Sequence, residues 1–165
     1  MSFTITANQS RAFALHTTMK PILPLLALIL LTGCASVPMA DTSLDYEAKK
    51  FNPESGKANI YINRGGGVGT ALTLQTIFDG RITGTLAPHT YQLLSVPAGD
   101  HVVSIGGENQ NAAQSKFKAE LGKNYFFDVG FSMGWVSPRV HLEMVDEQTG
   151  RLELKDSKRA ESSNY

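Results

Sequence analysis

The sequence predicts an all-β domain, a single antiparallel β-sandwich or small barrel of about 7–9 short strands. Apolar and polar residues alternate with a period of two along several segments, which places neighbouring side chains on opposite faces of a strand. Turn-forming residues separate these segments at intervals of about ten residues. No segment between them has a sustained apolar stripe of helical period, which argues against βαβ units and a parallel sheet.

The expected strands follow one another from Ala58 to Val145. The first carries Ala58, Ile60 and Ile62 on one face and Asn59, Tyr61 and Asn63 on the other. The alternation is clearest from Ser115 to Leu121, where apolar residues alternate with two lysines and a glutamate, so we expect one buried and one exposed face. The remaining expected strands are Leu72 to Phe78, Arg81 to Leu86, Tyr91 to Val96, His101 to Ile105, Tyr125 to Phe131 and Val140 to Val145.

Turn residues mark the connections. Asp79-Gly80 predicts a tight hairpin, and the segments Pro97 to Asp100 and Gly122 to Asn124 predict further turns. The segment Asp146 to Thr149 leaves two alternatives open. It either begins a short helical piece or reverses the chain into residues 151–154.

Composition divides the chain into four parts. Residues 1–33 form a leader, 34–52 a tether, 53–155 the β domain, and 156–165 a disordered tail. A flexible tether of about 18 residues has an end-to-end distance of roughly 25 Å, which holds a domain clear of lipid headgroups. A short helix from Ser43 to Lys50 is the alternative for the tether.

The leader contains an apolar run from Pro21 to Leu31. A run of about 11 residues is too short for a transmembrane helix, which needs about 20, and it fits the core of a signal peptide. Met19-Lys20 supplies the positive flank, so Met19 is the expected start. Residues 1–18 are then either an extended leader or the result of a start codon assigned too far upstream, and we expect them to take no part in the fold.

The run ends in Leu31-Thr32-Gly33-Cys34, which resembles the lipobox of bacterial lipoproteins. The resemblance implies that a signal peptidase recognises Leu31, Thr32 and Gly33 and cuts before Cys34. It also implies a diacylglyceryl group on the Cys34 thiol and a membrane anchor of two or three acyl chains such as palmitate. The alternatives are a free cysteine near a secretory cleavage site and the end of an uncleaved anchor.

Ala35 follows Cys34 where some lipoproteins carry aspartate. By resemblance to enterobacterial sorting, Ala35 implies lipid anchoring at the periplasmic face of the outer membrane. In a cell with a single membrane, the same lipobox implies the outer face of the cell membrane.

Several turn and strand motifs between Lys49 and Leu154 occur in a recognisable order. The chain resembles a bacterial family known as domain of unknown function 2846, and also the PEGA type of small β-sandwich. This resemblance implies a lipid-anchored or secreted β domain and carries no established reaction. The segments that carry it are 56–67, Phe78-Asp79-Gly80, Ala87-Pro88-His89-Thr90-Tyr91, Val96-Pro97-Ala98-Gly99-Asp100-His101, Gly122-Lys123-Asn124-Tyr125-Phe126 and Met133-Gly134-Trp135.

Charge and cysteine content limit the function classes. Thirteen basic and fifteen acidic residues follow Cys34, so the mature chain has a net charge of −2. A nucleic-acid-binding protein would be strongly basic, so no nucleic acid is expected as a partner. The chain has a single cysteine and therefore no internal disulfide. The expected partners are the membrane, through the lipid anchor, and an envelope protein or polysaccharide.

Two motifs suggest catalysis or ligand binding and fit their contexts poorly. Ser132 lies in a G-x-S-x-G pattern, the nucleophile elbow of α/β-hydrolases, but neither a following helix nor an alternating α/β pattern is present. The glycine-rich segment 64–69 lacks the spacing of a phosphate-binding loop, so a plain loop is expected there. We expect no catalytic residue, and a hydrolase that uses Ser132, His101 and Asp128 is the alternative, as is a carrier of an apolar ligand.

Three residues are the candidates for partner binding. Arg64, beside the glycine-rich segment, would pair with a carboxylate or sugar acid, and Trp135 with nearby Arg139 has the composition of an interaction hot spot. Burial of the tryptophan in the core is the alternative. The histidines lack the spacing of a local ligand set, so we expect no metal and no cofactor.

Overall fold

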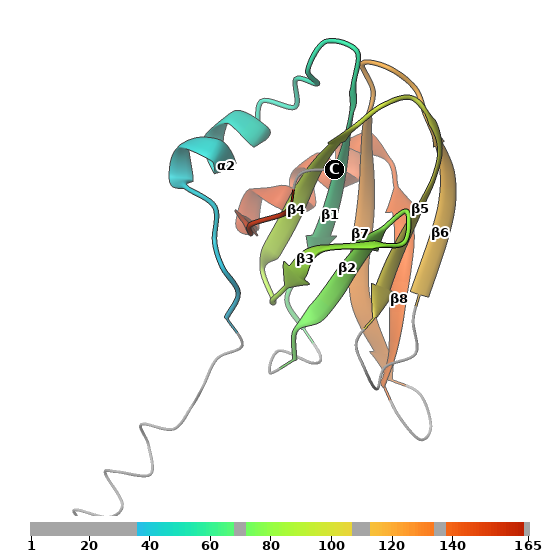
Figure 1. Ribbon diagram of the computed structural model, residues 1–165. Helices are drawn as coiled ribbons and strands as arrows, with labels where there is room; N and C mark the ends of the chain where they lie inside the picture. The colour runs from blue at the N-terminus through green and yellow to red at the C-terminus, as the bar shows by residue number, and fades with distance from the viewer. Residues whose placement is uncertain (1–35, 68–71, 107–112, 134–137, 164–165) are drawn as a thin grey trace, which may run out of the picture. The chain divides into compact units, whose positions relative to one another are not determined.

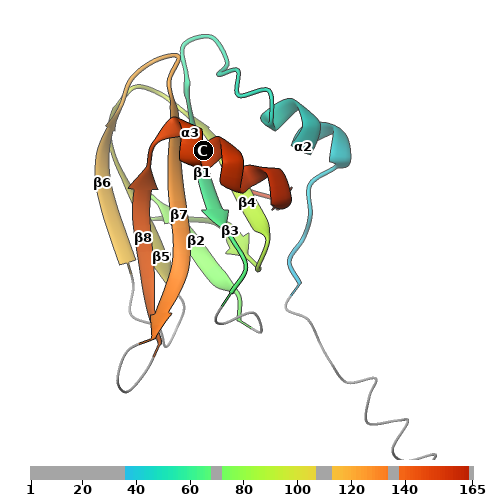
Figure 2. The same ribbon diagram turned by 180° about the vertical axis from the view of Figure 1, so that it is seen from behind.

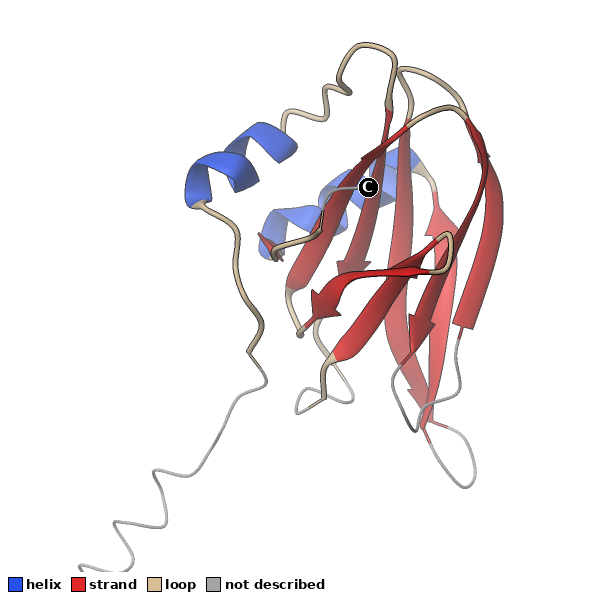
Figure 3. Ribbon diagram, viewed as in Figure 1, coloured by secondary structure: helices blue, strands red, loops and turns tan. Residues whose placement is uncertain are grey.

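The structure is a computed structural model that describes residues 36–67, 72–106, 113–133 and 138–163. In this part of the chain, nine strands form two sheets that face each other (Figures 1 and 3). The five-stranded sheet has the order β8-β7-β1-β4-β9, and the four-stranded sheet has the order β3-β2-β5-β6. The prediction of an all-β sandwich is confirmed.

Most expected strands occur within two or three residues of their predicted ends. The strands are β1 (Ala58–Arg64), β2 (Leu74–Phe78), β3 (Arg81–Leu86), β4 (Thr90–Val96), β5 (Gly99–Gly106), β6 (Ala113–Ala119), β7 (Asn124–Met133), β8 (Pro138–Val145) and β9 (Lys158–Arg159). The helical elements are α2 (Thr42–Ala48), α3 (Glu147–Glu153) and the 3-10 turn η2 (Leu154–Asp156). Of the two alternatives for the segment that begins at Asp146, the structure contains the helix, α3. The Asp146 carboxylate accepts a hydrogen bond from the backbone N–H of Thr149 at 3.0 Å and caps this helix.

The predicted hairpin at Asp79-Gly80 is confirmed. Both residues have positive φ angles, 47° and 80°, as a two-residue turn between antiparallel strands requires, and they join β2 to β3. His101 on β5 holds this turn, because its Nδ1 lies 2.8 Å from Oδ2 of Asp79 and its Nε2 lies 3.1 Å from the carbonyl oxygen of Pro97.

The expectation of purely antiparallel pairing is wrong at two places. Strand β1 pairs in parallel with β7, and β4 pairs in parallel with β9. Between β1 and β7 the chain runs through β4 of the same sheet and all four strands of the other sheet, so it returns to β1 in the same direction. The described residues between β1 and β7 contain no helix, so this parallel pair differs from a βαβ unit.

Two apolar clusters hold the domain together, one on each face of the five-stranded sheet. The inner cluster fills the space between the sheets and includes Ile60, Ile62 and Phe127. The outer cluster is made of Ala48, Tyr61, Tyr91, Phe126 and Leu154. Helices α2 and α3 lie on this outer side (Figure 2). Strand β1 is consequently buried along its whole length.

The predicted boundaries of the tether and the tail are corrected by the structure. The backbone of Ala40 donates to the carbonyl of Arg159 at 3.0 Å, and the backbone of Glu161 donates to the carbonyl of Pro38 at 2.9 Å. Ala48 and Ala160 are buried. Residues 38–52 and 156–163 thus pack on the sandwich instead of extending from it, because together they cover the apolar outer face of the sheet.

Helix α3 packs closely against Phe126 of β7 through Gly150. A Cβ at this position would lie 2.3 Å from Cγ of Phe126, a distance that real side chains do not reach. We expect Gly150→Ala to lower the free energy of unfolding by about 2 kcal/mol, because overpacking costs up to about 3 kcal/mol and the gain in helix propensity is only about 1 kcal/mol. Denaturant unfolding measures the change. The control is Gln148→Ala at an exposed position of the same helix, which should be as stable as the wild type or more so.

Candidate functional site

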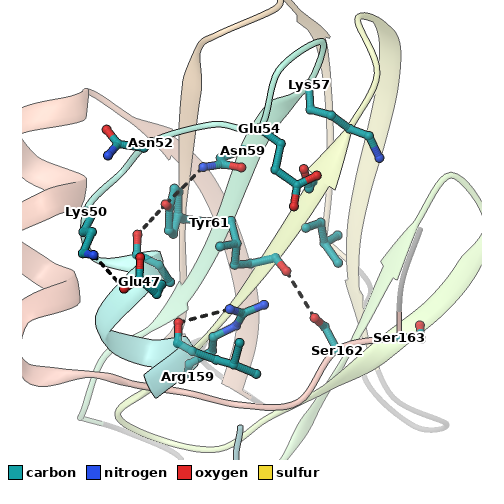
Figure 4. Close-up of a pocket in the computed structure, with 15 residues that line it drawn as sticks. Glu47, Lys50, Asn52, Glu54, Lys57, Asn59, Tyr61, Arg159, Ser162 and Ser163 are labelled. Carbon is teal, nitrogen blue, oxygen red and sulfur yellow. Dashed lines mark hydrogen bonds and ion pairs between the residues drawn. The ribbon is translucent and has the colours of Figure 1, made fainter. Parts of the chain in front are cut away.

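A groove of about 690 Å³ lies on the outer face of strands β1 and β4 (Figure 4). Its floor contains Asn59 and Tyr61 of β1 and, directly opposite them in register, Ser95 and Leu93 of β4. Helix α2 and the loop that follows it contribute one set of lining residues, and the C-terminal segment 159–163 contributes another. The groove exists because the two terminal segments cover the sheet only partly.

The floor is polar and partly unsatisfied. The hydroxyl of buried Tyr61 donates to the carbonyl of Ala48 at 2.7 Å and lies 3.4 Å from the side-chain nitrogen of Asn59, which is 4% exposed. Burial raises the pKa of Tyr61 to about 12, so the hydroxyl remains a hydrogen-bond donor at neutral pH. Within the described residues, Ser95 Oγ and Arg159 Nε are buried and have no hydrogen-bond partner.

The rim carries charges of both signs. Glu47 and Glu54 are acidic, and Lys50, Lys57 and Arg159 are basic. Lys50 and Glu47 already form an ion pair at 2.6 Å (Figure 4). A rim of this kind does not select a strongly charged ligand of either sign.

Asp45 fixes the position of the helical wall. Its Oδ1 accepts hydrogen bonds from the hydroxyl of Tyr91 at 2.7 Å and from the backbone of Arg159 at 3.0 Å. Its Oδ2 lies 3.1 Å from Nζ of Lys49, which also donates to the carbonyl of Ser157 at 2.7 Å. One carboxylate therefore joins helix α2, strand β4 and the C-terminal segment.

The surroundings of Asp45 lower its pKa. Partial burial by itself would raise the pKa, but the hydrogen bonds from Tyr91 and Lys49 and the positive charge of Lys49 outweigh that effect. Burial, together with the same carboxylate, raises the pKa of the Tyr91 hydroxyl. The Tyr91 hydroxyl thus stays protonated and keeps donating to Asp45 at neutral pH.

Arg64 has a structural role, which corrects the expectation that it lies on an accessible loop. It is the last residue of β1, is 2% exposed, and donates to the carbonyl oxygens of Leu72 at 2.7 Å and Leu86 at 3.1 Å. Its guanidinium also lies 5.2 Å from the centre of the Phe131 ring. Desolvation lowers its pKa. The side chain holds the ends of neighbouring strands together and is not presented to a partner.

The other predicted site residues are separated from the groove. Ser132 lies in the regular ladder between β7 and β8, opposite Arg139, and its hydroxyl lies 3.5 Å from the Arg139 carbonyl oxygen. Arg139 itself is exposed. Leu31, Thr32, Gly33, Cys34 and Trp135 lie outside the described residues.

The titratable residues of the hydrolase alternative are held by other partners. His101, on an inner strand of the four-stranded sheet, is bonded to Asp79 and Pro97, and Asp128 of β7 lies 3.7 Å from His141 of β8. In the part of the chain that the structure covers, no group of three His, Cys, Asp or Glu side chains is placed to hold a metal ion. None of the helices described there is long and apolar enough to cross a membrane.

A protein of Haemophilus influenzae, described as an uncharacterized protein, is 35% identical to this chain over 124 residues. The match covers 74% of this chain and 73% of the Haemophilus protein. The chain belongs to the family of this Haemophilus protein. No family model matches the chain, and no solved structure matches it. The matched length exceeds that of residues 53–155, so the family similarity extends into at least one of the terminal segments that cover the sheet.

Sequence reasoning missed the residues that line the groove. Asn59 was correctly placed on the face opposite Ile60, and the only available signal was that this face also carries Tyr61, a large side chain that favours burial. Ser95 and Arg159 gave no signal, because they share the groove only when the segment around Arg159 packs beside β4.

We expect Asp45→Ala to lower the free energy of unfolding by about 2 kcal/mol, because it removes charge-assisted hydrogen bonds and leaves the Tyr91 hydroxyl without its acceptor. Denaturant unfolding at neutral pH measures the loss. Asp41→Ala is the matched control, since Asp41 begins the same helix without a side-chain capping bond and should change stability little. Equal losses in the two variants would contradict the role assigned to Asp45.

The wild type and Asp45→Ala also test how the contribution of Asp45 to stability depends on pH. The folded-state pKa of Asp45 lies below its unfolded-state value of about 3.9, so its contribution is present above that value and disappears as the pH falls through the folded-state pKa. The stability difference between the wild type and Asp45→Ala should therefore shrink as the pH is lowered from 6 to about 3.

Proposed function

We propose that the protein is a lipid-anchored lipoprotein of the cell envelope whose β domain is a non-enzymatic binding or structural module. The observation that carries the binding role is the groove over β1 and β4, which is lined by residues of both terminal segments. A module of this kind agrees with the resemblance to domain of unknown function 2846 and to the PEGA type, which we retain as part of the proposal.

The anchor rests on Leu31-Thr32-Gly33-Cys34. Pro38, whose carbonyl is bonded to the backbone of Glu161, lies four positions after Cys34, and four residue-to-residue steps span about 14 Å at most. A domain attached through acylated Cys34 would lie close against the lipid headgroups. We place it at the periplasmic face of the outer membrane because Ala35 follows the cysteine.

Two structural features support a binding role over catalysis or transport. The G-x-S-x-G serine lies in a regular antiparallel ladder, whereas a nucleophile elbow needs a sharp strand-to-helix turn. The space between the sheets is occupied by a cluster of thirteen buried residues, which disfavours a carrier of an apolar ligand. The groove is open to an envelope protein or polysaccharide, and the charge balance disfavours nucleic acid.

Metabolic labelling with palmitate in a bacterial host tests the anchor. We expect the full-length chain to incorporate the label and to fractionate with the outer membrane, and we expect Cys34→Ser to do neither. Labelling that persists in Cys34→Ser would show the lipobox assignment to be wrong, whatever the groove binds.

Site-specific photo-crosslinking in the envelope tests the binding role. A photoreactive amino acid at Lys50, on the groove rim, should yield a discrete crosslinked envelope component. The same amino acid at Lys118, exposed on β6 of the other sheet, should not. Identical crosslinks from both positions, or none from Lys50, would contradict a role for the groove.

A further inference from the structure

The groove contains an open strand edge. Strand β9 pairs with β4 only at Thr90 and Tyr91, and the chain then leaves β4 to pair Ser162 with Gly84 of the other sheet. The second half of β4, from Leu93 to Val96, therefore has β1 on one side and no strand on the other within the described residues.

The backbone groups of Leu93 and Ser95 face this open edge. The Tyr91 carbonyl accepts a hydrogen bond from Ala160, which places the Tyr91 backbone on the outer side of β4. Hydrogen-bonding direction alternates along a strand, so Leu93 and Ser95 share that side while Leu94 bonds toward β1. Leu94 lines the groove although its side chain is 2% exposed and packs in the core, which indicates that the β4 main chain itself lines the groove.

One outward backbone group already has a substitute partner. The hydroxyl of Ser162 donates to the carbonyl of Leu93 at 3.2 Å (Figure 4). It takes the place of the N–H that a neighbouring strand would supply. A backbone N–H of an added strand could replace the Ser162 hydroxyl as the donor, and the Leu93 carbonyl would then keep one hydrogen bond.

We propose that the groove binds an extended peptide segment of a partner protein, which adds as a strand to β4 at Leu93 and Ser95. This inference rests on the proposed binding role and is independent of the lipid anchor. Main-chain hydrogen bonds supply the affinity in strand addition, and pockets for alternate side chains supply the specificity. Among the residues that line the groove, Leu44 and Leu93 offer apolar contacts. The rim of mixed charge suits a peptide better than a polyanionic polysaccharide.

A phage library of random heptapeptides, selected on the full-length chain, tests the proposal. A synthetic copy of the strongest binder should slow amide exchange at Leu93 and Ser95. N-methylation at alternate residues of the peptide should weaken binding about tenfold per lost hydrogen bond, and N-methylation at the intervening residues should have little effect. Peptides that tolerate methylation at both sets of positions, or that leave both amides unprotected, would overturn strand addition.

Ser95→Pro supplies the matching change in the protein. Proline removes the outward N–H and leaves the ladder to β1 intact, since the Ser95 N–H does not point toward β1. We expect Ser95→Pro to lose the selected peptides and Ser95→Ala to bind them within a few fold of the wild type. If Ser95→Pro unfolds, the methylated peptides still decide the question.

The possible failures are distinguishable. A selection that yields no specific peptide overturns this inference, whereas crosslinking from Lys50 and palmitate labelling test the binding role and the anchor separately. Crosslinking of Lys50 to a polysaccharide would also overturn it, while leaving the binding role in place.

Discussion

Strand β1 is buried on both of its faces, and the arrangement of the remaining elements depends on that constraint. Its inner residues pack between the sheets, as in any sandwich. Its outer residues include Tyr61, which is 0% exposed and lies 5.0 Å from Phe126 between ring centres. A two-layer sandwich does not cover that outer face, so further segments must do so. The chain supplies them from its two ends, and the outer layer is part of the fold.

Polar interactions determine where the segments that cover the outer face lie on the five-stranded sheet. Aromatic packing brings Phe51, Tyr61 and Phe126 together, and Arg151 of α3 stacks 4.4 Å above the Phe51 ring. Apolar packing alone is compatible with several positions of a short helix. The carboxylate of Asp45, on α2, selects one of them, because it is bonded at once to Tyr91 of β4, to Lys49 after the helix and to Arg159 of the C-terminal segment. The groove is the area that this fixed but incomplete cover leaves open.

The strands were predictable because their signal is local. Alternation and turn residues place β3 and the hairpin at Asp79-Gly80 without knowledge of the rest of the chain. The parallel pairing of β1 with β7 was not predictable, because it depends on the path of the chain through the other sheet. Arg64 was misjudged for a related reason, since the carbonyl groups that bury it belong to residues 8 and 22 positions away.

The ends of the chain were the least predictable part. Residues 158–159 are charged and form only a two-residue strand, so composition indicated a tail. Their order comes from partners such as Asp45, which is 114 positions away from Arg159. The groove combines residues from both ends with the middle of the chain, so no local pattern marks it. Composition is a property of the segment alone, whereas its burial depends on the residues that pack against it.

The pairing of the two chain ends sets the order in which the domain is completed during synthesis. Contacts over such long sequence separations form late, because the intervening chain must first be closed into a loop. The cover over the outer face of the five-stranded sheet stays incomplete until residues 154–161 have been made. For an exported protein, as proposed here, this delay keeps the nascent chain incompletely folded, the state in which a translocation channel accepts it.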